Sequence, residues 1–600
     1  MSEAKKFNFI GQRTIRPDGH DKVTGKANYA ADLALPGMIW GKILRSPHAH
    51  AKILKLDTSK AEAMLGVMSV ATFDDLPSVS NEAIQSGEGA IDSLDLGRNV
   101  LARDKVLYHG HAIAAIAAKT VAIAEKALEL IDVEYEVLTP VLDLHAAMKA
   151  DAPLLHEDMF TQGYPEQPEK PSNIAARHEL KMGDVEAGFA EADVIVERDF
   201  VTPTVHQGYI EPHACTVSYN TEGQSMVWCS TQGHFDVRAS TAKLLAMPLG
   251  NLKVIASEIG GGFGGKTTVY LEPIALILSR KSGRPVKMMM DRDEVFRASG
   301  PASAARLTVK VGGKKDGTIT AMQTSIAYEA GAFKGSPAMI GGMTAFTPYN
   351  CPNVYCETFD VVVNKPKVAA YRAPGAPQAE FGAEMAVSEL AEKLGIDPVD
   401  LRLQNAAKEG TQTVYGPKLK AVGLVECLEA AKNSPHYKTE LKEGEGRGIA
   451  SGFWFNIGGQ SSVTINMNPD GTGTIVEGSP DIGGSRASMQ MMASEELGIP
   501  LNDLKPIIGD TESIPYNQST GGSRTTFATG MAVIEAAQDV VQQLKERAAS
   551  LWNVTPDQVE WRDGSAINTA GEGQMTCAEI CAKCEKTGGQ ISGTGNVNAR

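Results

Sequence analysis

The strongest constraint in this sequence is a run of five glycines in six positions, residues 260–265, which only Phe263 interrupts. Glycine gives up more backbone freedom on folding than any other residue, so such a run indicates a place where bare backbone is required. An apolar run at 252–255 precedes it and a helical tract at 272–280 follows it. Because backbone N–H groups at such a turn can converge on an anion, the run predicts a ligand-binding loop.

Two kinds of ligand are compatible with this loop. From Gly260 to Thr267 it satisfies the pattern G-x-x-x-x-G-K-[ST] of nucleotide-binding P-loops, and a later apolar run that ends at Asp291 imitates the acidic strand of such enzymes. The glycine surplus is larger than a phosphate cradle needs, which favours a bulky flat ligand or the oxygen ligands of a metal. A P-loop NTPase therefore stays an alternative, as does a tight turn without a ligand.

Four further clusters combine glycine with Gln, Ser, Thr or Arg. They are TQGHF at 231–235, YRAPGAPQ at 371–378, PDIGGSR at 480–486 and STGGSRT at 519–525. A single nucleotide needs one phosphate loop, whereas this set of loops fits a large cofactor that several parts of the chain hold. Together the clusters favour the large cofactor.

Composition and charge exclude several other classes. Lys and Arg total 57 against 72 Asp and Glu, a formal charge of −15, so nucleic acid is not expected as the main partner. No apolar run approaches the ~18 residues of a membrane-spanning helix. Eight irregularly spaced cysteines are too few for a disulfide scaffold, and the start MSEAKKFNFIGQ lacks an apolar signal segment. We therefore expect a cytoplasmic protein with reduced thiols.

The pattern along the chain predicts an α+β protein with three domains. Residues 107–145 have strand, helix and strand patterns in turn, which predicts a first α/β domain over 16–148. The remaining divisions are a linker at 149–174, a second domain at 175–410, a polar connecting segment at 411–447 and a third domain at 448–600. The final GQISGTGNVNAR has the composition of a polar loop, so we expect the third domain to be incomplete at its carboxyl end.

Five motifs in order along the chain resemble the molybdenum-binding (large) subunit of the xanthine oxidase family of molybdenum hydroxylases. They are STQGHFDVR, EIGGGFGGK, AYRAPGAPQ, SPDIGGSRASMQMMASEELGIP and GDTESIPYNQSTGGSRTTFATGMAV. The amino-terminal KVTGKANYAADLALPGMIWGKILRSPHAHAKI is similar to the first domain of that family, so the resemblance runs from about Arg16 onward. It implies an α/β hammerhead-like domain followed by two elongated α+β molybdopterin-binding domains.

The resemblance implies a catalytic subunit that inserts water-derived oxygen into a C–H bond of an aromatic, N-heterocyclic or aldehyde substrate. Its cofactor would be molybdenum on a molybdopterin cytosine dinucleotide, held by the pterin dithiolene and not by protein side chains. Two electrons would leave through 2Fe–2S clusters and FAD on partner subunits, in a dimer of heterotrimers. Reduction of an aromatic acyl-CoA is the alternative within the family.

Site residues carry over from the motifs one by one. Gln232 matches the Gln that approaches the molybdenum ligands, and Arg372 matches the Arg that orients substrate and stabilises negative charge. Phe263, between Gly262 and Gly264, matches the loop whose backbone amide hydrogen-bonds an oxo ligand. Contacts to the pterin and its dinucleotide tail are implied for two loops, Ile482, Gly483, Gly484 and Ser485, and Ser519, Thr520, Gly521, Gly522 and Ser523.

Departures from the family pattern restrict the substrate. Thr267 stands where purine oxidisers carry a second glutamate, and Ala373 stands where CO dehydrogenases carry a copper-binding cysteine. Neither xanthine nor CO is therefore expected as the substrate. Tyr415 and one of Trp454 or Phe455 lie where relatives use aromatic side chains to sandwich a flat substrate, while ordinary core packing explains them equally well.

The chain also lacks a match for the family's general base. That base is a glutamate in a G-x-G-E segment, and the nearest candidate here, AGEGQ at 570–574, has the pattern of a polar turn. We therefore expect a catalytically incomplete chain, whose base comes from a missing segment or from a second polypeptide. The cysteines at 577–584 and the histidines at 206–213 are explained better by packing than by metal binding.

Overall fold

One seven-stranded sheet joins two stretches of chain that are far apart in the sequence. The computed structural model describes residues 6–86 and 89–600. In it the strands lie in the order β13-β12-β11-β14-β1-β7-β3. Their bounds are β1 (Ile39–Arg45), β3 (Val67–Thr72), β7 (Ala112–Ala118), β11 (Ala214–Ser218), β12 (Ser225–Cys229), β13 (Leu252–Ala256) and β14 (Val286–Met289). The parallel pairing of β1 with β14 makes the hammerhead region and the second region one layer, while the predicted division at residue 148 stays a prediction.

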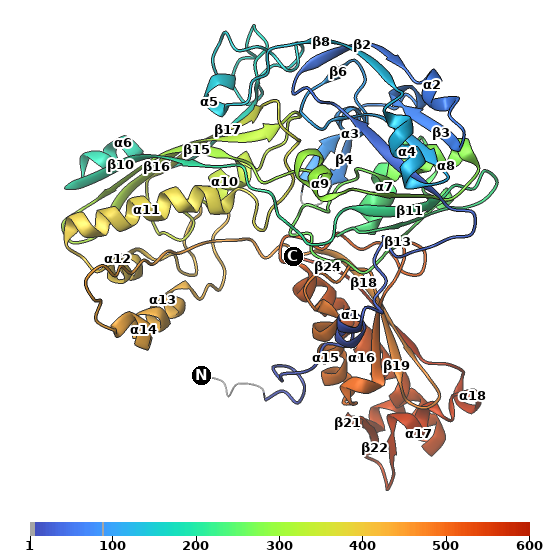
Figure 1. The fold of residues 1–600 in the computed structure, drawn as a ribbon. Helices are drawn as coiled ribbons and strands as arrows, with labels where there is room; N and C mark the ends of the chain where they lie inside the picture. The colour runs from blue at the N-terminus through green and yellow to red at the C-terminus, as the bar shows by residue number, and fades with distance from the viewer. Residues whose placement is uncertain (1–5, 87–88) are drawn as a thin grey trace.

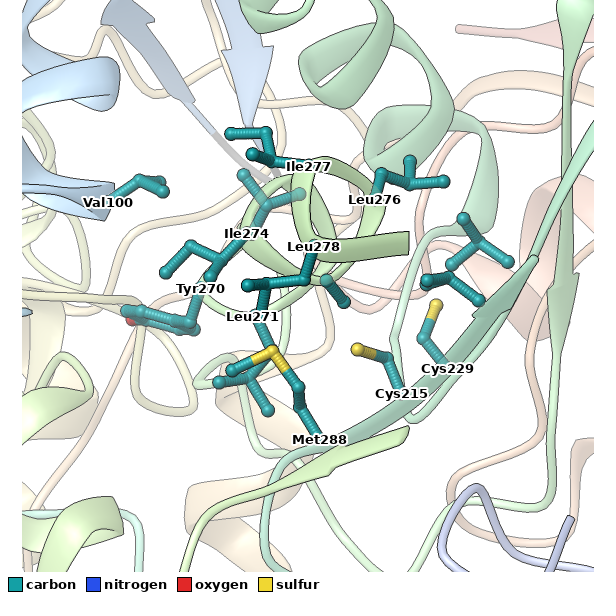
Figure 2. Close-up of a cluster of buried hydrophobic side chains, with 14 of the residues drawn as sticks. Val100, Cys215, Cys229, Tyr270, Leu271, Ile274, Leu276, Ile277, Leu278 and Met288 are labelled. Carbon is teal, nitrogen blue, oxygen red and sulfur yellow. The ribbon is translucent and has the colours of Figure 1, made fainter. Parts of the chain in front are cut away.

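Helix α8 (Glu272–Ser282) packs against this sheet and forms a large apolar core with it. Every residue of α8 from Glu272 to Ser279 is buried, as expected for a helix that is apolar on all sides. Figure 2 shows Ile274 and Leu278 of this helix close to Cys215 and Met288 of the strands and to Val100. The helix begins at Glu272, a few residues after the glycine-rich loop, so this core anchors the segment that leaves the loop.

A second sheet forms the elongated arm at the left of Figure 1. Its five strands have the order β10-β15-β16-β17-β9. Their bounds are β9 (Ile174–Met182), β10 (Val194–Thr202), β15 (Ala305–Gly313), β16 (Ile319–Gly331) and β17 (Val354–Val362). Helix α11 (Ala376–Leu394) packs along β10 and β15, and buries small residues such as Ala379 and Ala383 there. The AYRAPGAPQ motif enters this helix.

A third sheet lies at the lower right of Figure 1, with the order β20-β19-β18-β24. Its strands are β18 (Gly459–Met467), β19 (Gly473–Glu477), β20 (Leu504–Ile508) and β24 (Ser592–Ala599), and it packs on α15 (Ser485–Leu497) and α16 (Gly530–Trp552). The prediction that the last residues form a loop is wrong, because β24 pairs with β18 over its whole length.

Two glycines explain why the sequence pattern of β24 was misleading. A Cβ on Gly593 would lie 2.2 Å from Ala536 O, and one on Gly595 would lie 2.0 Å from Ala532 O. Both glycines therefore let α16 lie directly against the strand. Their lack of side chains, which suggested a loop, is a consequence of this close packing.

The strand–helix–strand pattern at 107–145 is confirmed by β7, α4 (Val121–Leu128) and β8 (Asp132–Val137). The other helices are α1 (Gly19–Thr24), α2 (Ser59–Glu62), α3 (Ser93–Val100), α5 (Leu144–Ala147), α6 (Val185–Ala190), α7 (His234–Leu244), α9 (Arg292–Ala298), α10 (Ala338–Thr344), α12 (Pro398–Asn405), α13 (Leu424–Asn433), α14 (Pro435–Lys438), α17 (Cys577–Cys581) and α18 (Cys584–Thr587). The other strands are β2 (Ala51–Asp57), β4 (Ala83–Ser86), β5 (Gly89–Asp92), β6 (Lys105–Val106), β21 (Val559–Arg562), β22 (Ser565–Asn568) and β23 (Gln574–Thr576). Within the described residues, no helix combines the length and apolar character that a membrane crossing requires.

Candidate functional site

Gln232 lies where two of the predicted loops meet. It follows β12, precedes α7, and is only 3% exposed. Its Oε1 accepts hydrogen bonds from the amides of Gly264 (2.7 Å) and Lys266 (3.3 Å). Its Nε2 donates to Thr520 O at 2.8 Å. The side chain therefore joins the glycine-rich loop to the 519–523 loop, and one Nε2 hydrogen is left for another acceptor.

The glycine-rich loop presents bare backbone beside Gln232. A Cβ on Gly262 would lie 2.5 Å from Gln232 Oε1, and one on Gly264 would lie 2.4 Å from Ala370 O. Phe263 itself has φ +53°, a conformation that L residues seldom adopt. Among the described residues, the amides of Gly261, Gly262 and Phe263 have no acceptor. Three successive open N–H groups fit a ligand that presents oxygen or other anionic atoms.

A buried ion pair closes the base of this loop. Lys266 Nζ lies 2.8 Å from Glu211 Oε2 and 2.7 Å from Ser230 Oγ, and it stands 4.9 Å from the centre of the Tyr209 ring. Glu211 Oε2 also accepts the amide of Gly260 at 2.7 Å. Both ends of the glycine run are thus attached to one carboxylate. Burial lowers the pKa of Lys266, and Glu211 opposes that shift.

This arrangement contradicts the P-loop alternative. A P-loop lysine has to reach phosphate oxygens, whereas the Lys266 side chain is fully buried and already paired. A P-loop also continues directly into its helix, whereas α8 begins only at Glu272, five residues beyond Thr267. The NTPase interpretation is therefore wrong, and the pattern match is a coincidence of composition.

The Arg372 loop lies against the glycine-rich loop. The amide of Arg372 donates to Phe263 O at 2.9 Å. Arg372 and Ala373 have φ values of +34° and +68°, so two neighbouring non-glycine residues hold a strained conformation. The Arg372 side chain is exposed, and α11 starts three residues after Ala373. The structure thus brings Gln232, Phe263 and Arg372 into one site through their backbones.

Three amides of the Ile482 loop already bind a carboxylate of the protein. Asp481 Oδ1 accepts from Gly483 (3.2 Å), Gly484 (2.6 Å) and Ser485 (2.9 Å). The Ser485 hydroxyl, in contrast, is buried without a hydrogen-bond partner. Of the four residues predicted here, the Ile482 amide and this hydroxyl have no hydrogen-bond partner among the described residues.

The 519–523 loop is held from both sides. Thr520 receives a hydrogen bond from Gln232 Nε2 and gives one to Pro480 O at 2.8 Å, which links the loop to the Asp481 region. Gly522 and Ser523 have positive φ values of +59° and +61°. The next residue, Arg524, is 1% exposed and donates to four oxygen atoms, three of them backbone carbonyls. Sequence reasoning ended at Ser523 and missed Arg524, because nothing in GGSR marks the arginine as buried.

The residues predicted for the substrate side fall into two groups. Thr267 donates to Gly264 O at 2.8 Å and lines a cavity of about 150 Å³ that also contains Pro374. Tyr415 lies in an aromatic cluster with Phe453, Trp454 and Phe455, in which neighbouring ring centres are 5.1–6.5 Å apart. The amide of Phe453 binds Glu380 of α11 at 2.7 Å, so this cluster lies beside the helix that follows the Arg372 loop.

The other clusters noted in the sequence are packed in the protein interior. Cys577, Cys581 and Cys584 are buried in the core of the third region. His213 Nε2 is 2.6 Å from Tyr209 Oη, and burial holds its pKa well below the usual range. Among the described residues, no group of three His, Cys, Asp or Glu side chains could hold a metal ion.

Known proteins share this architecture. Residues 24–139 match the family model of the aldehyde oxidase and xanthine dehydrogenase a/b hammerhead domain, and residues 166–406 and 424–599 match models of the molybdopterin cofactor-binding domain. The chain is 32% identical to a probable xanthine dehydrogenase subunit from Bacillus subtilis, over 92% of this chain and 72% of that protein. It is 34% identical to the nicotinate dehydrogenase large molybdopterin subunit of Eubacterium barkeri, over 71% of this chain and 96% of that protein. The crystal structure of the Cu,Mo-CO dehydrogenase superposes with a TM-score of 0.86 at 27% identity, covering 99% of this chain and 80% of that one.

Proposed function

Because the chain belongs to the xanthine oxidase family and is a molybdenum-binding catalytic large subunit, we propose that it hydroxylates an aromatic, N-heterocyclic or aldehyde carbon. It is a molybdenum-dependent oxidoreductase that binds a molybdopterin cofactor. The observation that carries the proposed site is the row of three open amides at 261–263 beside the partly engaged amide of Gln232. These donors suit the oxygen-rich surroundings of such a cofactor.

When bound, the molybdenum pterin supplies the oxygen insertion and accepts two electrons. The amide of Phe263 and the second Nε2 hydrogen of Gln232 would donate to the bound group and fix its orientation. The pairing of Lys266 with Glu211 keeps those donors in place before substrate arrives, which is the preorganisation that electrostatic catalysis needs. The exposed guanidinium of Arg372 would orient substrate and stabilise negative charge that develops on it.

The remaining site residues would hold the rest of the cofactor. We assign the Ile482–Ser485 and Ser519–Ser523 stretches to the pterin and its tail, and the tail to a cytosine dinucleotide. The buried Ser485 hydroxyl, which has no partner, supports this assignment.

Partner subunits would carry the electrons away. The xanthine dehydrogenase and nicotinate dehydrogenase relatives are both named as subunits, which supports iron–sulfur and FAD partners in a heteromeric complex. We propose that this complex is a dimer of heterotrimers. All eight cysteines are unpaired thiols, which is typical of a reducing compartment, so we propose a cytoplasmic location.

Metal analysis and cofactor extraction on the purified native complex test this function. We expect stoichiometric molybdenum and a pterin dinucleotide that yields cytosine. Gln232→Ala should change the molybdenum EPR signal, whereas Gln404→Ala, an exposed amide in α12, should leave it unchanged. A complex without molybdenum, or an EPR signal that ignores Gln232→Ala, contradicts the assignment.

A further inference from the structure

A cavity of about 150 Å³ lies next to the glycine-rich loop and is built by several distant parts of the chain. Residues 267–270 form one wall and residues 367–374 the wall that leads into the Arg372 loop. Residues 335–340 form a third wall, and Ile91 and Asn99 of the hammerhead region also line the cavity. The cavity therefore begins at Thr267, directly after the loop that we assign to the cofactor.

A half-buried ammonium that lacks a counter-ion lines the cavity. Lys367 Nζ donates to Gly335 O at 2.7 Å and to Val368 O at a long 3.4 Å. No carboxylate lies within ion-pair distance of it among the described residues, and none lines the cavity. Burial lowers the pKa of Lys367 to about 8, although the more distant Asp360 and Asp95 act to raise it. The side chain is thus largely an ammonium at neutral pH, and it meets only carbonyl oxygens, so a carboxylate in the cavity could form a charge-assisted hydrogen bond with it.

Uncharged polar groups point to the same kind of ligand. Ser336 Oγ is buried and has no hydrogen-bond partner. Tyr270 Oη accepts the amide of Gly300 at 2.9 Å, so its own hydrogen remains to be donated. Asn99 uses its Oδ1 to accept from Tyr108 at 3.2 Å, which leaves its amide hydrogens. These donors suit the oxygen atoms of an anion.

The size and the apolar walls limit the rest of the ligand. A cavity of ~150 Å³ holds one benzene-sized ring. Ile91, Ile340, Val368 and two prolines, Pro337 and Pro374, supply apolar surface for such a ring. A carboxylate on a single ring therefore matches both the charge and the volume.

We propose that this cavity binds the carboxylate end of a single-ring aromatic or N-heterocyclic acid, and that Lys367 selects the acid over its neutral amide. The proposal rests on the proposed function, which it narrows to a carboxylated substrate. The proposal involves no additional reaction step, because the difference in binding affinity alone selects the acid over the amide.

Calorimetric titration of the native complex with benzoate and with benzamide tests the proposal, because neither measurement depends on turnover. The wild-type complex should bind benzoate more tightly than benzamide. Lys367→Met should weaken benzoate binding about tenfold or more, the value of a charge-assisted hydrogen bond, and change benzamide binding less than about twofold. Lys334→Met is the matched control, because that exposed ammonium pairs with Asp92 outside the cavity and should leave both affinities unchanged.

A second measurement on the wild-type complex does not depend on the variant folding. Benzoate affinity should be constant from about pH 6 to pH 7.5 and fall as Lys367 loses its proton above pH 8. The other titratable side chains that face Lys367 are Asp360, Asp95 and Tyr270, and burial raises the pKa of Tyr270 to about 12. The proposal is overturned if the wild-type complex does not bind benzoate, if Lys367→Met weakens benzoate and benzamide binding equally, or if benzoate affinity does not change with pH. Missing molybdenum with intact benzoate selectivity would instead refute the proposed function alone.

Discussion

Replacing Lys266 with methionine should loosen the base of the glycine-rich loop more than any surface substitution. The Lys266 ammonium is fully buried and contacts Glu211 Oε2 (2.8 Å), Ser230 Oγ (2.7 Å) and the Tyr209 ring. Methionine fills nearly the same volume but removes the charge, so it isolates the electrostatic contribution. Glu211 would keep the amide of Gly260 and the Ser230 hydroxyl, but its Oε1 already lacks a partner.

The expected loss of loop stability in Lys266→Met is the penalty for leaving one member of a buried ion pair without its partner, about 3–5 kcal/mol. Because each ~1.4 kcal/mol is a factor of ten, local opening of the loop should become about 10² to 4 × 10³ times more frequent. Glu211→Gln in the same chain removes the stranded charge, so the double variant should recover most of the loss. Lys281→Met is the control, because Lys281 pairs with Asp75 (2.8 Å) at the surface, where such pairs contribute about 0–1 kcal/mol.

Hydrogen exchange read by mass spectrometry is the suitable assay, because it reports the opening of one segment in a chain with several domains. Peptides that cover 258–270 should exchange much faster in Lys266→Met, while peptides from α16 should not change. The reasoning is refuted if Lys266→Met accelerates that segment no more than Lys281→Met does. It is also refuted if adding Glu211→Gln fails to restore protection.

Two further substitutions test other parts of the structure. Gly264→Ala places a Cβ 2.4 Å from Ala370 O, at a φ of +107° that alanine rarely adopts. Metal analysis should therefore find that this variant complex has lost most of its molybdenum. Gly250→Ala is the control, because nothing lies within 4 Å of the added Cβ, and it should bind molybdenum as the wild type does. Burial raises the pKa of Glu477 from 4.5 to about 8, so the folded chain keeps a proton that the unfolded chain releases, and stability falls as the pH rises from about 4.5 to 8. The difference of 8 − 4.5, at about 1.4 kcal/mol per pH unit, sets an upper value of about 5 kcal/mol. Glu477→Gln should therefore raise the calorimetric unfolding temperature at pH 8 but not at pH 4.5, and an equal change at both pH values would contradict this.

The sequence could predict the glycine-rich loop because its signal is local. The glycine run needs no knowledge of distant residues to indicate bare backbone, and α8 follows it as an apolar helix would. The family resemblance then orders the other loops around it, and the structure does join Gln232, Gly264 and Thr520 directly. The glycine composition of residues 592–599 could not show whether they form a loop or a strand. Gly593 and Gly595 are required because the backbone of α16 packs against β24 at these positions, and that contact is not visible in the local sequence.

The buried charges whose contacts the sequence could not predict have partners far away in the chain. Glu211 lies 55 residues before Lys266, and Arg524 binds carbonyl groups at 458 and 460 more than sixty residues earlier. No pattern with a period of two or 3.6 residues records such pairings, since a buried charge looks the same in a sequence as a solvated one. The burial of Lys266 in an ion pair with Glu211 distinguishes this loop from a P-loop, whose lysine must reach phosphate oxygens.

The same reasoning explains why the substrate stays hidden in the motifs while the cofactor does not. A cofactor shared by a family is held by loops that the family shares, and each loop carries its own signal. The Lys367 cavity instead takes Asn99 from the hammerhead region, Ser336 from the arm, and Thr267 from just after the glycine-rich loop. Only Thr267 stands out in the sequence, as a departure from the family pattern, and nothing there connects it to Asn99 or Ser336. In our proposal, selectivity for the acid therefore depends on residues from several regions, and substitutions at that junction should change the affinity for benzoate more than that for benzamide.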